Sequence, residues 1–395
     1  MDAPTAVPAN GPQHRLLVVD DNEMNRDMLS RRLQRQGFHV ELAENGQLAL
    51  EAICAAPFDL VLLDIMMPVM NGYDLLERLK GDPALRHIPI IMITAVDDAE
   101  SIARCIEMGA EDHLPKPFNP AILRARVDSA LAKKRLRDRE QVYARSLERE
   151  LSIGREIQRS FLPHALPATS GWQLDARFQP ARQVAGDFYD AFELPDGRLG
   201  LVVADVCDKG VGAALFMALF RSLLRVLASQ NCTDPDPQKV LAGTLGSIND
   251  YIADTHSRAN MFATVFFGVL APASGALHYV NAGHDPPVVL EPGSDTPRRL
   301  APSGPAVGLS AGLAFRVDST MLAPGATLLA FTDGVTDACD SEARMFGEAR
   351  LLGLLDARPE STAAATLDRI EAALADHVQD GPRFDDITLL AVRRD

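Results

Sequence analysis

Reactive side chains lie at the ends of apolar segments in the first third of the chain. Asp20 and Asp21 follow the first such segment, and Asp64 ends a later one. Thr94 and Lys116 lie at the ends of two more. Clustered carboxylates repel one another unless a divalent cation is present, and oxygen ligands suit magnesium. A carboxylate in such a pocket can attack a phosphoryl group, while a lysine and a hydroxyl contact the transferred phosphate.

A second set of aspartates lies in the C-terminal half of the chain. Asp187, Asp205 and Asp333 each adjoin an apolar β-like run, and so do Asp385 and Asp386. Rigid carboxylates that face one another cannot stay ionised and unpaired. Two divalent cations would neutralise them, and a water between those cations would be a hydroxide-like nucleophile near neutral pH. The pattern therefore predicts hydrolysis of a phosphomonoester without a covalent intermediate.

The first set of residues needs a sheet whose strands end at one edge. Residues 15–130 alternate short apolar runs with helical patterns five times. Repeated strand–helix units predict a parallel, doubly wound α/β sheet, and ligands of such sheets bind beyond the carboxyl ends of the strands. Residues 1–14 are small, polar and proline-bearing, and they are predicted to form a disordered tail.

Residues 131–162 differ from the segments on either side. Positions 131–160 hold nine basic and five acidic residues and no proline. Sparse apolar residues at steps of seven and four predict one long linker helix with a narrow apolar seam, interrupted near Gly154. Two interpretations stay open: a solvated connector helix, or a coiled coil that forms a homodimer and carries a signal.

Residues 163–395 are rich in short β-like runs separated by glycine, proline and aspartate turns. Helical stretches interrupt these runs at 210–229, at roughly 236–254 and near the end of the chain. Runs of strands with helices between them predict an α+β layered domain.

The composition excludes several classes of protein. The net charge of −15 argues against nucleic acid as a partner, because backbone binding needs a basic face. The five cysteines are scattered and never paired as CxxC, which argues against a disulfide framework and a structural zinc site. We expect no signal peptide and no apolar run of membrane-spanning length, hence no membrane partner and a cytoplasmic location.

With these residues in place, the segment 15–130 resembles the receiver domain of two-component response regulators. The resemblance implies that Asp64 is the phosphoacceptor. It also implies pocket residues that bind magnesium (Asp20, Asp21, Asp64 and the backbone carbonyl of Met66) or the phosphate (Thr94 and Lys116). The aromatic switch position, usually tyrosine or phenylalanine, is His113 here. This departure leaves the pocket chemistry intact but puts the usual inward movement of an aromatic ring in doubt.

A series of motifs covers residues 150–393 approximately. In chain order they read IGREIQRSFLP, FQPARQVAGDFYD, ADVCDKGVGAALFMA, MFATVFFGVL, YVNAGHDPP, FTDGVTDA and FDDITLL. The series resembles SpoIIE-type phosphatases of the metal-dependent PPM (protein phosphatase 2C) family, which implies a pair of antiparallel sheets flanked by helices. The implied ligands of two manganese or magnesium ions are Asp187, Asp205, the backbone carbonyl of Val206, Asp333 and Asp385. Asp386 and Asp190 are second-line candidates.

Small departures from this family occur beside the implied site. Val206 stands where many relatives have glycine, Asp285 stands where asparagine is usual, and Cys207 lies in a loop often written with serine and glycine. His284 could contact the phosphate or the leaving group, although a structural role in its loop is the stronger interpretation. A nucleophilic role for Cys207 lacks a histidine or asparagine partner.

Together the two resemblances predict a response regulator whose output is a serine/threonine protein phosphatase. A sensor histidine kinase would phosphorylate Asp64, and the linker helix would transmit the change. The resemblance implies a phosphorylated anti-sigma-factor antagonist of the STAS type as substrate, in a partner-switching pathway. The opposing hypothesis is a non-catalytic adaptor that sequesters a sigma-factor regulator. It is disfavoured because all four ligand aspartates are present. A DNA-binding regulator is disfavoured by the charge.

Overall fold

The computed structural model covers the whole chain. It describes residues 14–94, 99–234, 236–294, 296–356, 362–379, 381 and 385–395. The predicted tail at 1–14 therefore lies outside the described residues except for its last position. The chain divides into two compact units, Met1–Leu147 and Glu148–Asp395.

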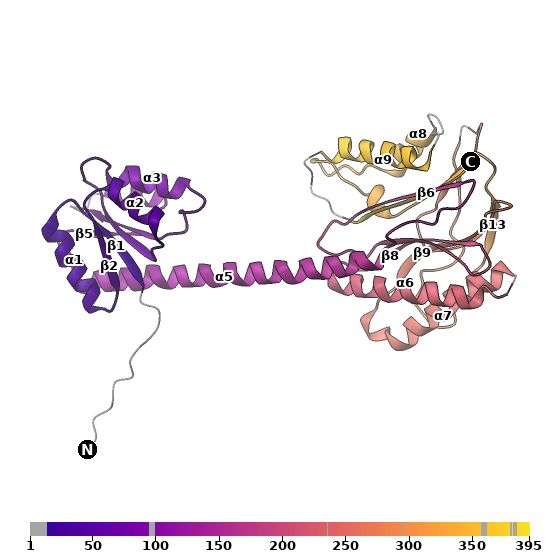
Figure 1. Cartoon of the computed structure of the whole chain (residues 1–395), viewed down its shortest axis with the longest axis horizontal. Helices are drawn as coiled ribbons and strands as arrows, with labels where there is room; N and C mark the ends of the chain where they lie inside the picture. The colour runs from indigo at the N-terminus through magenta and orange to yellow at the C-terminus, as the bar shows by residue number, and fades with distance from the viewer. Residues whose placement is uncertain are drawn as a thin grey trace, which may run out of the picture. The chain divides into compact units, whose positions relative to one another are not determined.

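The first unit contains a five-stranded parallel sheet with the strand order β2-β1-β3-β4-β5. Its strands are β1 (Arg15–Val19), β2 (His39–Ala43), β3 (Leu60–Asp64), β4 (Ile90–Thr94) and β5 (Asp112–Pro115). Its helices are α1 (Glu23–Arg35), α2 (Gly46–Ala55), α3 (Gly72–Gly81), α4 (Ala99–Glu107) and the start of α5 (Pro120–Phe161). The predicted doubly wound α/β fold is thereby confirmed (Figure 1).

Alternation along the strands builds two cores in this unit. Leu16 and Val18 of β1 pack on the face covered by α1 and α5, whereas Leu17 and Val19 pack on the face covered by α2 and α3. Successive side chains of a strand point to opposite faces, so a run that is apolar at every position fits a sheet covered on both sides.

Helix α5 is one continuous helix of 42 residues. The predicted interruption near Gly154 is therefore wrong. Glycine inside a helix costs about 1 kcal/mol relative to alanine, which a long helix tolerates. The helix passes the point at which the two units divide, and residues 131–162 form its middle and its end, with Leu162 just beyond the last turn.

The second unit contains two antiparallel sheets, in the orders β13-β10-β9-β8-β7 and β12-β11-β14-β15-β6. The first sheet is built from β7 (Phe188–Glu193), β8 (Leu199–Val206), β9 (Ala263–Ala271), β10 (Ala276–Ala282) and β13 (Asp318–Met321). The second is built from β6 (Trp172–Gln179), β11 (Val288–Leu290), β12 (Arg298–Arg299), β14 (Thr327–Phe331) and β15 (Ile387–Arg394). The helices are α6 (Val211–Asn231), α7 (Pro237–Thr255), α8 (Glu348–Asp356) and α9 (Ala363–Val378), with short 3₁₀ turns η1 (Ser257–Ala259) and η2 (Asp333–Val335).

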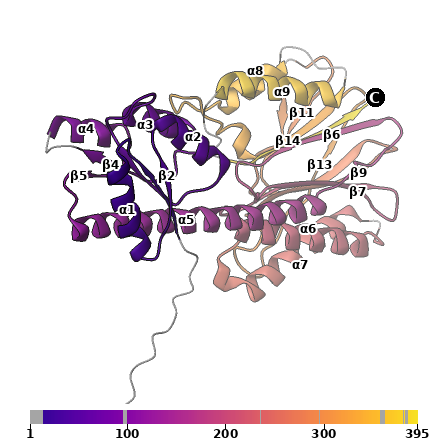
Figure 2. The same ribbon diagram turned by 60° about the vertical axis from the view of Figure 1, so that its left-hand side comes forward.

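These elements form four layers. One core, which includes Leu201, Phe266 and Leu390, fills the space between the two sheets. The helices α6 and α7 cover the outer face of the first sheet, and α8 and α9 cover the outer face of the second (Figures 1 and 2). The predicted α+β fold with two antiparallel sheets flanked by helices is confirmed.

Helix α6 corrects one expectation from the sequence. By length and composition it is apolar enough to cross a membrane, and it is the one such helix among the described residues. Its side chains Met217, Phe220 and Leu224 are buried in the core that it shares with α7 and the first sheet. One face of the helix is thus buried, and length and composition alone are weak evidence for a membrane span.

Candidate phosphoacceptor pocket and metal centre

The strand ends of the first unit bring the predicted pocket residues together. Asp20 follows β1, Asp64 ends β3, and one carboxylate oxygen from each of Asp20, Asp21 and Asp64 lies within 4.8 Å of the others. Lys116 Nζ lies 2.9 Å from an oxygen of Asp20 and 2.9 Å from an oxygen of Asp64. Asp20 also accepts hydrogen bonds from the amide of Asn25 at 3.2 Å. The predicted carboxylates and lysine therefore form one pocket.

Burial sets the electrostatics of this pocket. It raises the pKa of Asp64, and the ammonium of Lys116 opposes that rise without cancelling it. Burial alone would lower the pKa of Lys116, but the hydrogen bonds to Asp20 and Asp64 outweigh burial and raise it. The lysine therefore stays charged and faces the carboxylate that is predicted to accept the phosphate.

The remaining predicted pocket residues differ in exposure. Thr94 is buried, and its hydroxyl has no hydrogen-bond partner among the described residues. Such a group is free to donate to a phosphoryl oxygen. The Met66 side chain is exposed, as expected for a residue whose predicted role uses only the backbone carbonyl. His113 lies on β5, with its ring partly exposed beside Asp112.

The strand register brings the second set of aspartates to one end of the two sheets. Phe188 on β7 pairs with Ala204 on the antiparallel strand β8. Asp187, just before Phe188, therefore lies opposite Asp205, just after Ala204. Phe331 on β14 pairs with Leu389 on β15. Asp333 lies in η2 just after β14, and Asp385 lies just before β15. Both aspartates are therefore at the same end of the second sheet. Four segments far apart in sequence thus supply the predicted ligands.

Asp187 joins the two sheets. Its Oδ2 accepts hydrogen bonds from the hydroxyls of Thr332 at 2.7 Å and Thr388 at 2.9 Å. Burial and the neighbouring charge of Asp205 raise the pKa of Asp187 well above its usual value. The two threonines fix one carboxylate oxygen in place.

Asp205 and Asp333 line a common cavity of about 180 Å³ with Asp285 and His284. Burial, followed by the charge of Asp333, raises the pKa of Asp205 to about 7. Burial and the charge of Asp385 raise the pKa of Asp333. Burial also raises the pKa of Asp285 to about 6. The carboxylates around this cavity therefore carry more negative charge than the neighbouring side chains neutralise.

The histidine of this cavity is held in its loop. His284 is buried, its Nδ1 lies 2.9 Å from the Thr264 hydroxyl, and its backbone N–H donates to Asn281. Burial lowers the pKa of His284 to about 4, so the ring is neutral near pH 7. These contacts fix the orientation of the ring at the edge of the cavity.

Asp385 and Asp386 point to different partners. The Oδ2 of Asp385 lies 2.7 Å from Lys209 Nζ. Asp386 instead accepts from the backbone N–H groups of Ala181 at 2.8 Å and Gly186 at 2.9 Å. Gly334 packs so closely against the Asp386 carbonyl that a side chain there would collide with it. Asp386 thus holds the loop before Asp187, while Asp385 remains beside the metal-ligand candidates.

Asp190, a second-line candidate for a metal ligand, is bound by arginine side chains instead. It is fully buried, and Arg225 on α6 donates to both of its oxygens at 2.6 and 2.7 Å. Arg221 lies 2.9 Å from the same carboxylate. Two guanidinium groups already neutralise Asp190, so it is an anchor for α6 rather than a free ligand.

Cys207 is half-buried and accepts from the Phe262 N–H, with no base beside it among these contacts.

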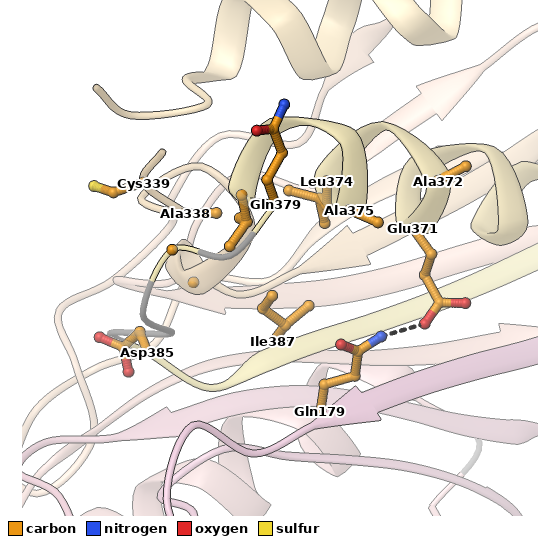
Figure 3. Close-up of a pocket in the computed structure, with 13 residues that line it drawn as sticks. Gln179, Ala338, Cys339, Glu371, Ala372, Leu374, Ala375, Gln379, Asp385 and Ile387 are labelled. Atoms are coloured by element: carbon orange, nitrogen blue, oxygen red, sulfur yellow. Dashed lines mark hydrogen bonds between the residues drawn. The ribbon is translucent and has the colours of Figure 1, made fainter. Parts of the chain in front are cut away.

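A second cavity lies under α9, with a volume of about 420 Å³ (Figure 3). Leu374, Ala375 and Ile387 line it, and Gln179 donates to Glu371 across its floor at 2.5 Å. Of the predicted metal ligands, Asp385 alone reaches its edge. The cavity is a neighbour of the carboxylate cluster and not part of it.

Both clusters offer only oxygen ligands, which suits magnesium or manganese. In the first unit the orphaned Thr94 hydroxyl and the three close carboxylates fit a magnesium ion with a phosphoryl group. In the second unit burial and mutual repulsion raise the pKa values of Asp187, Asp205 and Asp333, and the hydrogen bonds within the chain do not offset this rise. Bound cations would compensate the charge.

Sequence reasoning missed several residues that contact the predicted ligands or the segment just before Asp187. Thr332 and Thr388 bind Asp187, and Lys209 pairs with Asp385. Gln158 lies in the quoted motif IGREIQRSFLP and makes two hydrogen bonds to Ala185. Each of these residues stands within or beside a motif, but only the tertiary contacts give it a role.

Comparison with known proteins agrees with this geometry. Protein IcfG of Synechocystis sp. is 45% identical over 264 residues, which is 62% of this chain and 41% of IcfG. The probable transcriptional regulator ycf27 of Cyanidium caldarium is 40% identical over 122 residues, which is 31% of this chain and 48% of that protein. The chain thus spans less than half the length of either relative. The solved SiaA-PP2C domain of Pseudomonas aeruginosa matches with a TM-score of 0.55 and 24% identity, covering 64% of this chain and 99% of that domain, which shows the fold.

Family models match both units. The response regulator receiver domain matches residues 16–128, and Stage II sporulation protein E (SpoIIE) matches residues 195–395. The second match starts after Asp187 but includes Asp205, Asp333 and Asp385. The chain therefore belongs to the SpoIIE family, with a receiver domain followed by a phosphatase domain of the PPM type.

Proposed function

We propose that this chain is a response regulator in which phosphorylation of Asp64 controls a metal-dependent serine/threonine protein phosphatase. The observation that carries the proposal is the convergence of Asp187, Asp205, Asp333 and Asp385 at one end of the two sheets. Burial of carboxylates without full charge compensation costs stability, and groups in such an environment are concentrated at functional sites. The family to which the chain belongs supports the same activity.

In the phosphatase domain we assign the metal ligands to the four aspartates and the backbone carbonyl of Val206. Two manganese or magnesium ions held there would supply an activated water and charge neutralisation for a phosphoryl group. Asp187 is kept in position by two threonine hydroxyls, and Asp386 keeps the adjoining loop in place. The substrate class we propose is a phosphoserine or phosphothreonine of an anti-sigma-factor antagonist protein of the STAS type.

In the receiver domain we assign Asp64 as the phosphoacceptor for a sensor histidine kinase. Asp20, Asp21, Asp64 and the Met66 carbonyl would hold magnesium. Lys116 already touches Asp64, and a phosphate on Asp64 would offer it a more highly charged partner. The unpartnered hydroxyl of Thr94 is the natural donor to that phosphate.

The helix α5 is the proposed route of control, through a homodimer of this chain. Leu136, Tyr143, Leu147, Ile153 and Ile157 are exposed along it. Leu136, Tyr143 and Leu147 follow one another at steps of seven and four, and Ile157 follows Ile153 by four, a spacing that suits a helix–helix seam with a second copy. We propose that phosphorylation alters the register or packing of this seam.

A manganese-dependent assay with para-nitrophenyl phosphate tests the catalytic part. Wild type should turn over, whereas the double variant Asp205→Ala plus Asp333→Ala should not. Equal rates would refute the enzyme and favour the non-catalytic adaptor. Beryllofluoride tests receiver control: it should change the phosphatase rate of wild type but not of Asp64→Asn, and equal responses would refute that control.

A further inference from the structure

The last turns of α5 contain one buried polar side chain. Gln158 is 6% exposed, while its neighbours Ile157 and Arg159 on the same helix are exposed. Its Nε2 donates to the carbonyl of Ala185 at 2.6 Å, and its Oε1 accepts from the N–H of Ala185 at 3.0 Å. The side-chain amide thus pairs with one residue of another segment as a strand pairs with its neighbour.

Burying an amide costs free energy unless both of its polar ends are bonded. Both ends of Gln158 bond to the same residue, so the arrangement is satisfied in one position of the helix and not in others. Gly154 lies one turn earlier on the same face, and a side-chain carbon there would lie 3.8 Å from Val184. This face of α5 therefore contacts Ala185 through Gln158, and Gly154 faces Val184 one turn earlier.

The residues after Ala185 lead directly into the metal-ligand candidates. The N–H of Gly186 donates to Asp386 at 2.9 Å. A side-chain carbon on Gly186 would lie only 2.7 Å from the carbonyl oxygen of Val206, so that the backbone passes this carbonyl closely. Asp187 follows immediately. A shift of Ala185 would therefore reach Asp187 through one residue that has little room to absorb it.

We infer that Gln158 is a positioning residue for the metal centre: through its two hydrogen bonds to Ala185, it sets the place of the segment 185–187 and thereby the affinity of the site for its cations. The inference rests on the proposed function, because it deepens the role of α5 as the route of control. It adds the specific contact by which a movement of the helix end would reach Asp187.

The test is the binding of Mn²⁺ to the full chain, measured by titration calorimetry. Gln158→Met keeps the length of the side chain and removes both hydrogen bonds, while Gln158→Glu is nearly isosteric and removes the donor to the Ala185 carbonyl. Gln141→Met makes the same exchange at an exposed position of the same helix. We expect a Mn²⁺ dissociation constant about tenfold higher in both Gln158 variants, a size that corresponds to the loss of one or two ordinary hydrogen bonds. The value for Gln141→Met should equal that of wild type.

A thermal unfolding scan separates positioning from simple stability. If Gln158 only stabilises the fold, its variants would unfold at lower temperature but bind Mn²⁺ with the wild-type constant while folded, and the inference would be overturned. An equal loss of affinity in Gln141→Met would overturn it too. Should Gln158→Met fail to fold, Gln158→Glu decides alone by the same criterion. A wild-type chain that binds Mn²⁺ but hydrolyses no phosphomonoester would refute the proposed function and leave this test valid.

Discussion

The two acidic pockets of this chain differ in how the protein balances their charge. In the receiver pocket, Lys116 contacts both Asp20 and Asp64 at 2.9 Å. In the phosphatase domain, Lys209 pairs with Asp385, while burial and mutual repulsion raise the pKa values of Asp187 and Asp205. The receiver lysine therefore lies where it could contact the phosphate that we propose forms on Asp64. The phosphatase aspartates have less cationic compensation within the chain, which is consistent with the proposed binding of metal ions.

Two buried aspartates of the phosphatase domain differ in whether a cationic side chain is bound to them. Asp190 is buried like Asp187, but it is bound by the guanidinium groups of Arg221 and Arg225. Asp187 is bound by neutral hydroxyls and lies near other carboxylates. Burial alone therefore does not distinguish the proposed metal ligand Asp187 from Asp190, whereas the charge of the partners does.

The largest expected effect is the loss of turnover when a proposed metal ligand is replaced, compared with replacement of the arginine-bound Asp190. Asp205→Asn should lower Mn²⁺-dependent turnover by at least about a thousandfold, because it removes a ligand of the proposed centre. Asp190→Asn should retain the wild-type Mn²⁺ dissociation constant but lose about 2 kcal/mol of unfolding free energy, since two arginines lose their partner. This loss lies below the range for fully buried pairs because Arg225 is 39% exposed. Calorimetry with Mn²⁺ and chemical denaturation measure the two quantities, and a large loss of metal affinity in Asp190→Asn would contradict our assignment.

The second prediction concerns the stability of the metal-free protein as a function of pH. The pKa of Asp205 is raised to about 7 in the folded chain, so the folded state binds a proton that the unfolded state releases near pH 4. This stabilisation is complete below the unfolded pKa and is lost as the pH rises through about 7. In the presence of a chelator, the Tm of the phosphatase domain should therefore fall between about pH 5 and pH 8, by roughly 2–4 °C for each kcal/mol lost.

The variant Asp205→Asn is the control for this pH series. Its side chain does not titrate, so the fall in Tm should be smaller, although the raised pKa values of Asp187 and Asp333 still contribute in the same direction. Added Mn²⁺ should raise the wild-type Tm most at the alkaline end, where no proton competes for Asp205. A Tm that is independent of pH in this range would show that the carboxylates are balanced in some other way.

The smallest expected effects are changes in metal affinity when either of the two lysines is replaced. Lys116→Met should lower the Mg²⁺ dissociation constant of the receiver by about tenfold, because two carboxylates lose the ammonium between them. Lys209→Met should lower the Mn²⁺ dissociation constant of the phosphatase domain by only about threefold. The difference follows from solvent screening, since Lys209 and Asp385 are 39% and 33% exposed. Titration calorimetry gives both constants, and the reverse order would contradict the proposed difference in charge balance.

Most of the architecture was predictable from local patterns. Apolar runs that end in Asp20, Asp64 and Thr94 predicted the parallel sheet and the edge at which its pocket lies. The ordered motifs predicted the phosphatase domain. The predicted break at Gly154 was wrong, because a local propensity of about 1 kcal/mol does not decide the course of a helix of 42 residues.

The sequence by itself determined which strands end in acids, because alternation, turn residues and the position of each aspartate are local properties. The family resemblance ranked Asp190 below Asp187, which lies three residues earlier in the same motif, but the sequence offered no physical reason for the difference. Only the tertiary structure placed two arginines of α6 on the former and two hydroxyls of the second sheet on the latter. The roles of Gln158, Lys209 and Asp386 were likewise decided by partners far along the chain, since charge balance and hydrogen bonding depend on distance in space.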